Sequence, residues 1–270
     1  MTQSEHSKIK LAQDGDAAAL EDVVRSIQDR VFRLATRMLA DPVAAQDATQ
    51  EILIRIVTKL STYRGDSAFE TWVYRVATNY LLTARKMIAN DPGLSFEMFS
   101  DDLLDGLADD RTAAAEDHVM LNELRVRCTM AMLLCLDRDH RAAYVLGEIL
   151  ELDHREAASI VEVSPANFRK RLSRARSAVQ AFTAASCGLT TPTTAACTCR
   201  KRLPAAMASG RIGPTPSPAL SGAPSMSEAE TLAAETEAGL VAAKLQRATG
   251  PLTPLKDFAA DVLRIVDPPG

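Results

Sequence analysis

The chain has 270 residues, of which 47% are hydrophobic and 24% charged, with 35 acidic and 31 basic side chains. This length is sufficient for one or two modest hydrophobic cores. No apolar run approaches the roughly 18 to 20 residues of a membrane span, and the polar start MTQSEHSKIK is not followed by an apolar segment. We therefore expect a cytoplasmic protein without membrane insertion or a secretion signal.

The formal net charge of -4 is unevenly distributed along the chain. Residues 87–118 carry nine acidic side chains and one basic side chain, whereas residues 164–183 carry five basic side chains and no acidic one. A cationic surface can therefore exist within an acidic protein. The overall charge consequently does not exclude a nucleic-acid partner.

Three helices are predicted in the first part of the chain. From Ala17 to Ala40, apolar residues recur at three- and four-residue steps, as one face of a helix requires. Asp41 followed by Pro42 predicts the start of a second helix that runs to about Leu60. Ser67 and Glu70 have capping-box spacing and predict a third helix to about Lys86. We assign residues 1–88 to this domain.

A linker and a second helical domain follow. Residues 89–116 are assigned to the linker because they contain prolines, glycines and many acids without a sustained period. Further helices are predicted from about Glu116, from Arg138 to Leu150, from Asp153, and from Ser164 through about Thr183. Because only VEV separates the last two, residues 117–184 are predicted to contain a helix-turn-helix.

The composition changes again in residues 185–270. Six prolines lie between Thr190 and Pro224, which predicts an irregular segment. Residues 226–248 are predicted to form an amphipathic helix, and residues 255–266 a last short one. The expected fold class is therefore all-α: two small helical domains, an acidic linker, and a partly helical C-terminal extension.

The last helix of the second domain, SPANFRKRLSRARSAVQAF, has the residue types that read a major groove. Phe168, Leu172, Ala175 and Val179 can face the core, which places Asn167 and the basic residues Arg169, Lys170, Arg171, Arg174 and Arg176 on the outer side. Asn can pair with adenine and Arg with guanine, while other cations bind phosphate. The alternative is a solvated basic helix, but the preceding tight turn favours DNA binding.

The segment YRGDSAFETWVYRVATNY holds five of the chain's aromatic residues, interleaved with arginines. Aromatic planes beside cations are typical of proteins that bind single-stranded nucleic acid. The alternative is that the aromatic side chains belong to the core. That alternative is favoured for Trp72, Val76 and Tyr80, which have helical spacing, whereas Phe69 at the start of the helix fits either role.

These segments resemble extracytoplasmic-function sigma factors of bacterial RNA polymerase over about residues 17–183. DPVAAQDATQEILIRI and STYRGDSAFETWVYRVATN resemble the promoter-melting region two of that family. LDRDHRAAYVLGEILELDHREAASIVEVSPANFRKRLSRARSAV resembles its helix-turn-helix, region four. The resemblance implies promoter-specific transcription initiation, with promoter DNA and core RNA polymerase as partners through the β′ clamp helices and the β flap.

The resemblance also implies roles for individual residues. The clamp helices would contact Asp47, Gln50, Glu51 and Ile54. The −10 element would be melted and captured by Arg64, Ser67, Phe69, Arg75 and Asn79. The −35 duplex would be read by Ser164, Asn167, Arg169, Lys170, Arg171 and Arg174. The family usually has a small aliphatic residue at the position of Phe168, so the packing beneath this helix is expected to differ.

The extension resembles the C-terminal tails of some actinobacterial-type members, with CGL, a Pro/Thr spacer and CxC. Cys187, Cys197 and Cys199 could bind zinc with a fourth ligand from elsewhere, or form a reversible disulfide. Against zinc, paired CxxC motifs are absent and no His follows His154. We therefore expect no required cofactor. Our hypothesis is that the extension regulates the protein in cis.

Alternative functions differ in what the chain would contact. A helix-turn-helix regulator acting without core polymerase remains the main alternative, although no α/β receiver domain is present. An enzyme is disfavoured because we find no Gly-rich phosphate loop, HExxH motif or nucleophile elbow. A separate anti-sigma factor that binds the extension is a further candidate partner.

Overall fold

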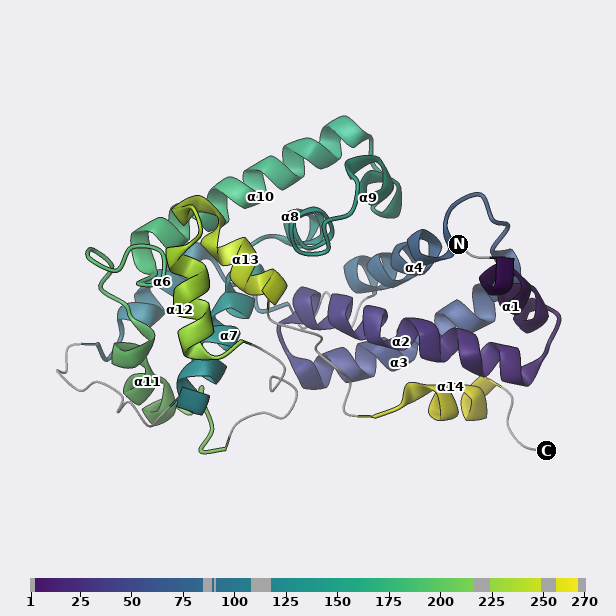
Figure 1. The fold of residues 1–270 in the computed structure, drawn as a ribbon, viewed down its shortest axis with the longest axis horizontal. Helices are drawn as coiled ribbons and strands as arrows, with labels where there is room; N and C mark the ends of the chain where they lie inside the picture. Colours follow the sequence, from purple (N-terminus) through teal and green to yellow (C-terminus); the bar gives the residue numbers. More distant parts are fainter. Residues whose placement is uncertain are drawn as a thin grey trace.

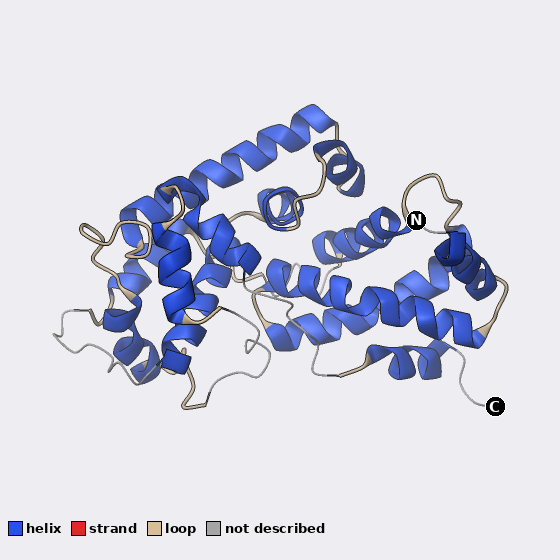
Figure 2. Ribbon diagram, viewed as in Figure 1, coloured by secondary structure: helices blue, strands red, loops and turns tan. Residues whose placement is uncertain are grey.

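The computed structural model describes residues 3–84, 89, 91–107, 118–215, 224–248 and 256–266. Within these ranges the regular elements are helices, and the β pairing consists of one isolated bridge between Cys187 and Cys197 (Figure 1, Figure 2). The predicted all-α fold class is confirmed. No described helix combines the length and the apolar character that crossing a bilayer requires.

The N-terminal half is built on two long antiparallel helices, α2 (Ala17–Leu39) and α3 (Pro42–Lys59), as predicted. The Asp41 carboxylate caps α3 by accepting hydrogen bonds from the amides of Val43 and Ala44 at 2.8 and 3.1 Å. α1 (Gln3–Gln13), which was not predicted, packs against α2. α4 (Phe69–Thr83) completes this group.

The predicted start of α4 was wrong in detail. Its N-cap is Ala68, and no side chain caps the helix. The backbone carbonyl of Ser67 accepts a hydrogen bond from the Tyr63 hydroxyl at 2.9 Å, while Glu70 forms an ion pair with Arg30 on α2. A local hydrogen bond and an ion pair to α2 are therefore present instead of the predicted capping box. The predicted end of this helix, at Lys86, lies outside the described residues.

The predicted linker contains a helix, α6 (Phe96–Leu104), capped by the Ser95 hydroxyl. Phe99 and Leu103 are buried, and the ring of Phe99 stacks on that of Phe182 with centroids 5.3 Å apart. The acidic side chains of α6 therefore lie on a helix that is anchored to the second half of the molecule. Residues 108–116 of the linker lie outside the described ranges.

The second half begins with α7 (His118–Leu134) and α8 (Arg138–Tyr144). α8 continues into a single π turn over Val145–Ile149, so the predicted helix from Arg138 to Leu150 is present with a wider final turn. α9 (His154–Ile160) and α10 (Pro165–Ser186) follow. α10 extends three residues beyond the predicted end.

The extension is more helical and more broken than predicted. α11 (Cys199–Ala208) lies within the segment predicted to be irregular. The predicted helix 226–248 is divided into α12 (Met226–Ala234), a 3-10 turn (Ala238–Leu240) and α13 (Val241–Ala248). α14 (Phe258–Val266) closes the chain; Leu255, where it was predicted to start, lies outside the described residues.

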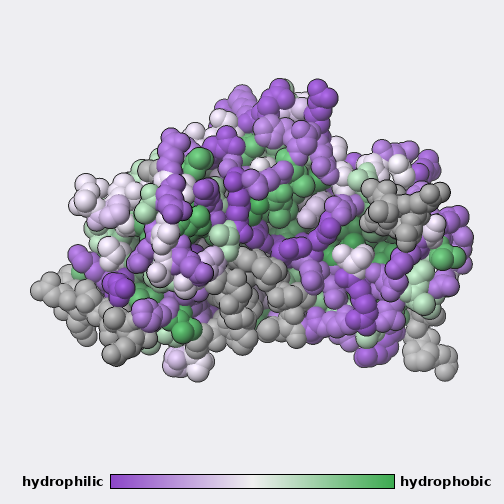
Figure 3. All heavy atoms as spheres, in the orientation of Figure 1, coloured by the Kyte–Doolittle hydropathy of each residue, from purple (hydrophilic) through white to green (hydrophobic). Residues whose placement is uncertain are grey.

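One hydrophobic cluster joins helices from both halves and from the extension. It contains Val24 of α2, Leu53 of α3, Phe168 of α10 and Phe258 of α14. Figure 3 shows hydrophilic residues over most of one face, with hydrophobic residues visible below α10. The two predicted DNA-binding domains are therefore packed on each other.

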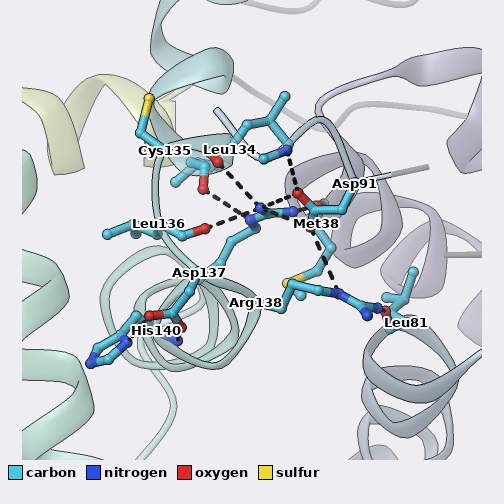
Figure 4. Close-up of polar contacts among 12 residues, drawn as sticks. Met38, Leu81, Asp91, Leu134, Cys135, Leu136, Asp137, Arg138 and His140 are labelled. Carbon is cyan, nitrogen blue, oxygen red and sulfur yellow. Dashed lines mark hydrogen bonds and ion pairs between the residues drawn. The ribbon is translucent and has the colours of Figure 1, made fainter. Parts of the chain in front are cut away.

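A buried arginine fastens the two halves together (Figure 4). Arg141 on α8 is 3% exposed and donates hydrogen bonds to the carbonyl oxygens of Met38, Leu133 and Leu136 at 2.9, 2.9 and 3.0 Å. It also pairs with Asp91 at 3.1 Å. One guanidinium thus satisfies carbonyl groups near the C-terminal ends of α2 and α7, which lack partners within their own helices.

Candidate nucleic-acid interface

α9, a three-residue turn and α10 form the predicted helix-turn-helix. The Ser164 hydroxyl caps α10 by accepting a hydrogen bond from the Asn167 amide at 3.2 Å, and Pro165 occupies the first helical position. In the turn, Glu162 has a left-handed backbone with a φ of 54°. This conformation lies within the short VEV segment that connects α9 to α10, and the two helices pack against each other.

The inner side of α10 is packed closely against the π turn. Phe168 and Leu172 are 0% and 2% exposed. A Cβ atom on Gly147 would lie 2.8 Å from Leu172 Cδ2 and 3.2 Å from Phe168 Cζ. A side chain at position 147 would therefore require the ends of the Leu172 and Phe168 side chains to move. The large side chain of Phe168 is accommodated by the absence of a side chain at Gly147.

The outer side of α10 presents most of the predicted −35 residues to solvent: Ser164, Asn167, Arg169, Lys170 and Arg174 are exposed. Arg171 is half-buried and pairs with Asp139 on α8 at 2.9 Å. Arg176, also predicted on the outer side, is half-buried, and its guanidinium pairs with the buried carboxylate of Glu148 at 2.5 Å. The described ion pairs give Arg169, Lys170 and Arg174 no acidic partner. The Asn167 side chain is exposed beside them.

A surface groove of about 730 Å³ separates the N-terminal half of α10 from α8. It is lined by Leu82, Asp137, Arg138, Asp139, His140, Asn167, Lys170, Arg171 and Arg174. Arg138 was not predicted, since it lies on another helix and only the tertiary structure brings it to α10. The groove has four arginine or lysine side chains and two carboxylates, so its lining is cationic and suited to an anionic backbone.

The predicted −10 loop places its residues in different environments. Arg64 is exposed, Ser67 and Arg75 are half-buried, and Asn79 is exposed on α4. Phe69 is 3% exposed, with its ring edge-on to Tyr63 at 5.2 Å and stacked on Trp72 at 5.8 Å. Its faces are occupied by these rings. Capture of a base by Phe69 remains a prediction, and it would require this aromatic cluster to rearrange.

We expect Phe69→Ala to destabilise the folded protein. The substitution leaves a cavity between Tyr63 and Trp72 and should lower the free energy of unfolding by about 3 kcal/mol. Chemical denaturation with Arg64→Ala as the control measures this effect, since Arg64 is exposed in the same loop. Equal stability of the two variants would show that the ring does not contribute to the core.

The predicted polymerase-binding residues lie on α3, and α14 lies across the same helix (Figure 1). Asp47 and Glu51 are exposed, whereas Gln50 and Ile54 are half-buried. Lys256 donates a hydrogen bond to Gln50 Oε1 at 2.9 Å, and the amide of Phe258 donates to Gln28 Oε1 on α2 at 2.9 Å. Lys256, two residues before α14, therefore contacts one of the four predicted residues directly.

The two predicted DNA-reading parts also contact each other. α4 packs against α9, and Thr71 donates a hydrogen bond to Glu156 at 2.6 Å. Arg138 donates to the carbonyl oxygen of Leu81 at the end of α4 (Figure 4). α4, which carries Arg75 and Asn79, is therefore held against α9, the first helix of the helix-turn-helix.

The five cysteines are free thiols and are half-buried. Cys187 and Cys197 form the isolated backbone bridge. In the part of the chain that the structure describes, no three His, Cys, Asp or Glu side chains are already arranged to hold a metal ion.

Comparisons with known proteins identify the family. The family described as Sigma-70 region 2 matches residues 23–87, and Sigma-70 region 4 matches residues 127–179. The RNA polymerase sigma-H factor of Pseudomonas aeruginosa is 30% identical over 178 residues, covering 63% of this chain and 89% of that protein. This chain belongs to the extracytoplasmic-function sigma factors. As a member of this family it directs promoter-specific transcription.

Two further similarities were found. The ECF RNA polymerase sigma factor SigW of Bacillus subtilis is 30% identical over 185 residues, covering 64% of this chain and 93% of that protein. The solved structure of CnrH in complex with the cytosolic domain of CnrY has a TM-score of 0.47 and 19% identity, covering 66% of this chain and 96% of that one. Both family matches end before residue 185, so the extension of this sigma factor lies outside them.

Proposed function

We propose that this sigma factor reads the −35 element with the outer side of α10. The observation that carries the proposal is the exposure of Asn167, Arg169 and Arg174 on a helix that follows a tight turn. The amide and the guanidinium groups can reach base edges, and Lys170 can bind phosphate. The groove beside α10 adds Arg138 to this cationic surface. The proposed role involves no catalytic step and no cofactor.

By the same proposal, α3 binds the polymerase clamp helices and the loop before α4 captures the −10 element. Asp47 and Glu51 are exposed on α3, and Arg64 is exposed in the loop. These positions are the ones that the family resemblance assigns. The partners are core RNA polymerase and promoter DNA.

The arrangement of the two halves supports regulation in cis by the extension. The −10 and −35 promoter elements are about 25 base pairs apart, which corresponds to roughly 85 Å along straight B-DNA. Yet Leu82 of α4 lines the same groove as Asn167 of α10. Simultaneous binding to both elements therefore requires the halves to separate.

The extension holds the halves in this closed arrangement. Arg247 on α13 pairs with Glu148 at 2.7 Å, and Gln246 donates to the carbonyl oxygen of Thr129 at 2.9 Å. Gln246 also accepts a hydrogen bond through its backbone oxygen from Arg37 on α2 at 3.4 Å. α13 thus binds both halves at once, and its contacts stabilise the closed form relative to the promoter-bound form.

The proposed readout predicts a change in the salt dependence of −35 duplex binding. Arg174→Ala should weaken binding and reduce the slope of log K against log salt by about 1 if the guanidinium neutralises one phosphate. Arg171→Ala should have a smaller effect, because Asp139 already neutralises that side chain. Arg264→Ala on α14, whose side chain is 67% exposed, is the control and should leave the slope unchanged.

Run-off transcription with core RNA polymerase tests the function as a whole. We expect the wild-type protein to co-purify with core polymerase and to initiate from its cognate promoter. Duplex binding without any association with core polymerase would instead support a helix-turn-helix regulator that acts alone. An unchanged salt slope for Arg174→Ala would remove this residue from the proposed interface.

A further inference from the structure

A buried arginine of the first half lies against the extension. Arg37 is 4% exposed and belongs to the last turn of α2. Its guanidinium donates to the carbonyl oxygen of Arg33 in the same helix at 3.3 Å, and to that of Gln246 on α13 at 3.4 Å. Both distances exceed the usual range for N–H···O hydrogen bonds. The contact between α2 and α13 therefore holds this cation only weakly.

The charge of Arg37 has no acidic partner among the described ion pairs, in which Arg25 and Arg30 are the arginines of α2 that take part. Its Nε atom is buried and lacks a hydrogen-bond partner among the described residues. Burial, followed by the like charge of Arg33, lowers the pKa of Arg37 to about 10. Burying a cation without an anionic partner is unfavourable, because the lost hydration is not replaced.

Arg141 shows how the same boundary between the halves accommodates a guanidinium whose hydrogen bonds are satisfied. It is buried to a similar extent as Arg37, at 3% exposed. However, it pairs with the carboxylate of Asp91 at 3.1 Å and donates to carbonyl oxygens at 2.9 to 3.0 Å. Arg141 therefore has the compensating groups that Arg37 lacks. The two arginines are expected to have opposite effects on the stability of the closed form.

Gln246, the residue that meets Arg37, is also incompletely paired. It is 1% exposed, and its Nε2 atom donates to the carbonyl oxygen of Thr129 on α7 at 2.9 Å. Its Oε1 atom is buried without a hydrogen-bond partner among the described residues. Two polar groups thus lack partners where α13 meets α2. On its other sides α13 packs against α7, α10 and the π turn, so it is seated on the second half.

We propose that Arg37 is a release point that keeps the closed form only marginally stable. The inference rests on the proposed function, in which the two halves separate. When they separate, α13 stays with the second half and Arg37 is uncovered. Its guanidinium then regains the hydration that burial removed. Arg247 acts in the opposite sense, because its pair with Glu148 at 2.7 Å seats α13 in the position from which it reaches α2.

An apolar side chain at position 37 should therefore lock the molecule closed. Well-packed apolar residues in place of buried ions often stabilise a structure. The substitution removes two hydrogen bonds, but both are long and their loss is the smaller effect. It changes the closed form more than the open form, because Arg37 is hydrated when the halves are apart. The ratio of closed to open molecules should rise about tenfold, which corresponds to about 1.4 kcal/mol.

The experiment measures the fraction of open molecules in the full chain. Fluorophores are attached through introduced non-natural amino acids, because the native cysteines are free thiols. Lys59 on α3 and Ser177 on α10 are exposed positions in the two halves. Single-molecule energy transfer should show more open molecules in Arg247→Ala than in the wild type. Adding Arg37→Met to Arg247→Ala should lower the ratio of open to closed molecules about tenfold, and Arg37→Leu should act alike.

Lys244→Met is the matched control, since it removes a positive charge from the exposed side of α13 and introduces the same residue. It should leave the open fraction unchanged. Arg37→Met alone should raise the concentration of core polymerase needed for half-binding about tenfold, because only open molecules bind. If the wild type binds no core polymerase, the proposed function fails, while the energy-transfer result still tests Arg37.

Two results would overturn the role of Arg37. The first is an open fraction that neither Arg37→Met nor Arg37→Leu lowers in the Arg247→Ala protein, which would mean that the buried charge does not weaken the closed form. The second is the absence of open molecules in both the wild type and Arg247→Ala, which would mean that the closed form is not marginally stable. Circular dichroism establishes that each variant is folded.

Discussion

Removal of α14 is expected to increase the affinity of the protein for core RNA polymerase by about tenfold to a hundredfold. In the closed form Phe258, Ala259 and Val262 of α14 are 0% exposed against α2 and α3. Burial of side chains of this size stabilises the contact by a few kcal/mol, and each 1.4 kcal/mol corresponds to about a tenfold change. A chain ending at residue 255 should therefore bind through α3 without competition from its own C-terminus.

A pair of point variants on α14 makes this test specific. Phe258→Ala removes a fully buried ring and should act in the same direction as the truncation, whereas Ile265→Ala removes a side chain that is 52% exposed. Fluorescence titration of labelled full-length protein with core polymerase measures both. If the truncated chain binds no more tightly than the wild type, α14 does not compete with the polymerase. A loss of affinity would indicate that α14 is part of the docking surface.

Arg141→Ala is expected to cause the largest loss of stability of any single substitution considered for this protein. The guanidinium is nearly inaccessible, and its removal leaves the carbonyl oxygens of Met38 and Leu136 without this donor, whereas that of Leu133 still accepts a hydrogen bond from the Leu136 amide at 3.2 Å. Each buried group left unsatisfied costs about 1–3 kcal/mol, so a total of about 4 kcal/mol is expected. For a chain of this size that corresponds to a decrease of roughly 10 °C in Tm.

Calorimetry of Arg141→Ala beside Arg155→Ala tests this prediction. Arg155 is exposed on α9 and its loss should change Tm by no more than about 1 °C. Arg141→Lys should recover only part of the stability, because an ammonium group cannot reach carbonyls in several directions as a guanidinium does. Similar melting temperatures for the two alanine variants would mean that the carbonyl groups find other partners, including water.

Several elements could be predicted because their determinants are local. The spacing of apolar residues and the caps at Asp41 and Ser164 lead to α2, α3 and α10 within one to three residues of their observed ends. α6 and α11 were missed since each is short and lies in a segment whose composition suggests a linker. The break after α12 was also missed. The 3-10 turn Ala238–Leu240 that follows this break packs against α10, a helix distant in the sequence.

For the predicted recognition surface, the sequence likewise predicts which residues are buried but not which cations form ion pairs. Periodicity identifies the buried side of α10, including Phe168 and Leu172, because burial of that side repeats with the helix. It does not identify which outer cations are paired. Arg171 and Arg176 lie on the outer side of α10 like Arg174. Yet Arg171 pairs with Asp139 of α8, and Arg176 pairs with Glu148 of the π turn.

The sequence by itself determined α2, α3, α10, the helix-turn-helix and the family, since each depends on residues that are close together in the chain. The tertiary structure alone decided that the two halves are closed on each other, that α14 packs against α2 and α3, and that Lys256 contacts Gln50. These features depend on contacts between residues tens to hundreds of positions apart. Such contacts are selected by the packing of a whole surface rather than by any local pattern.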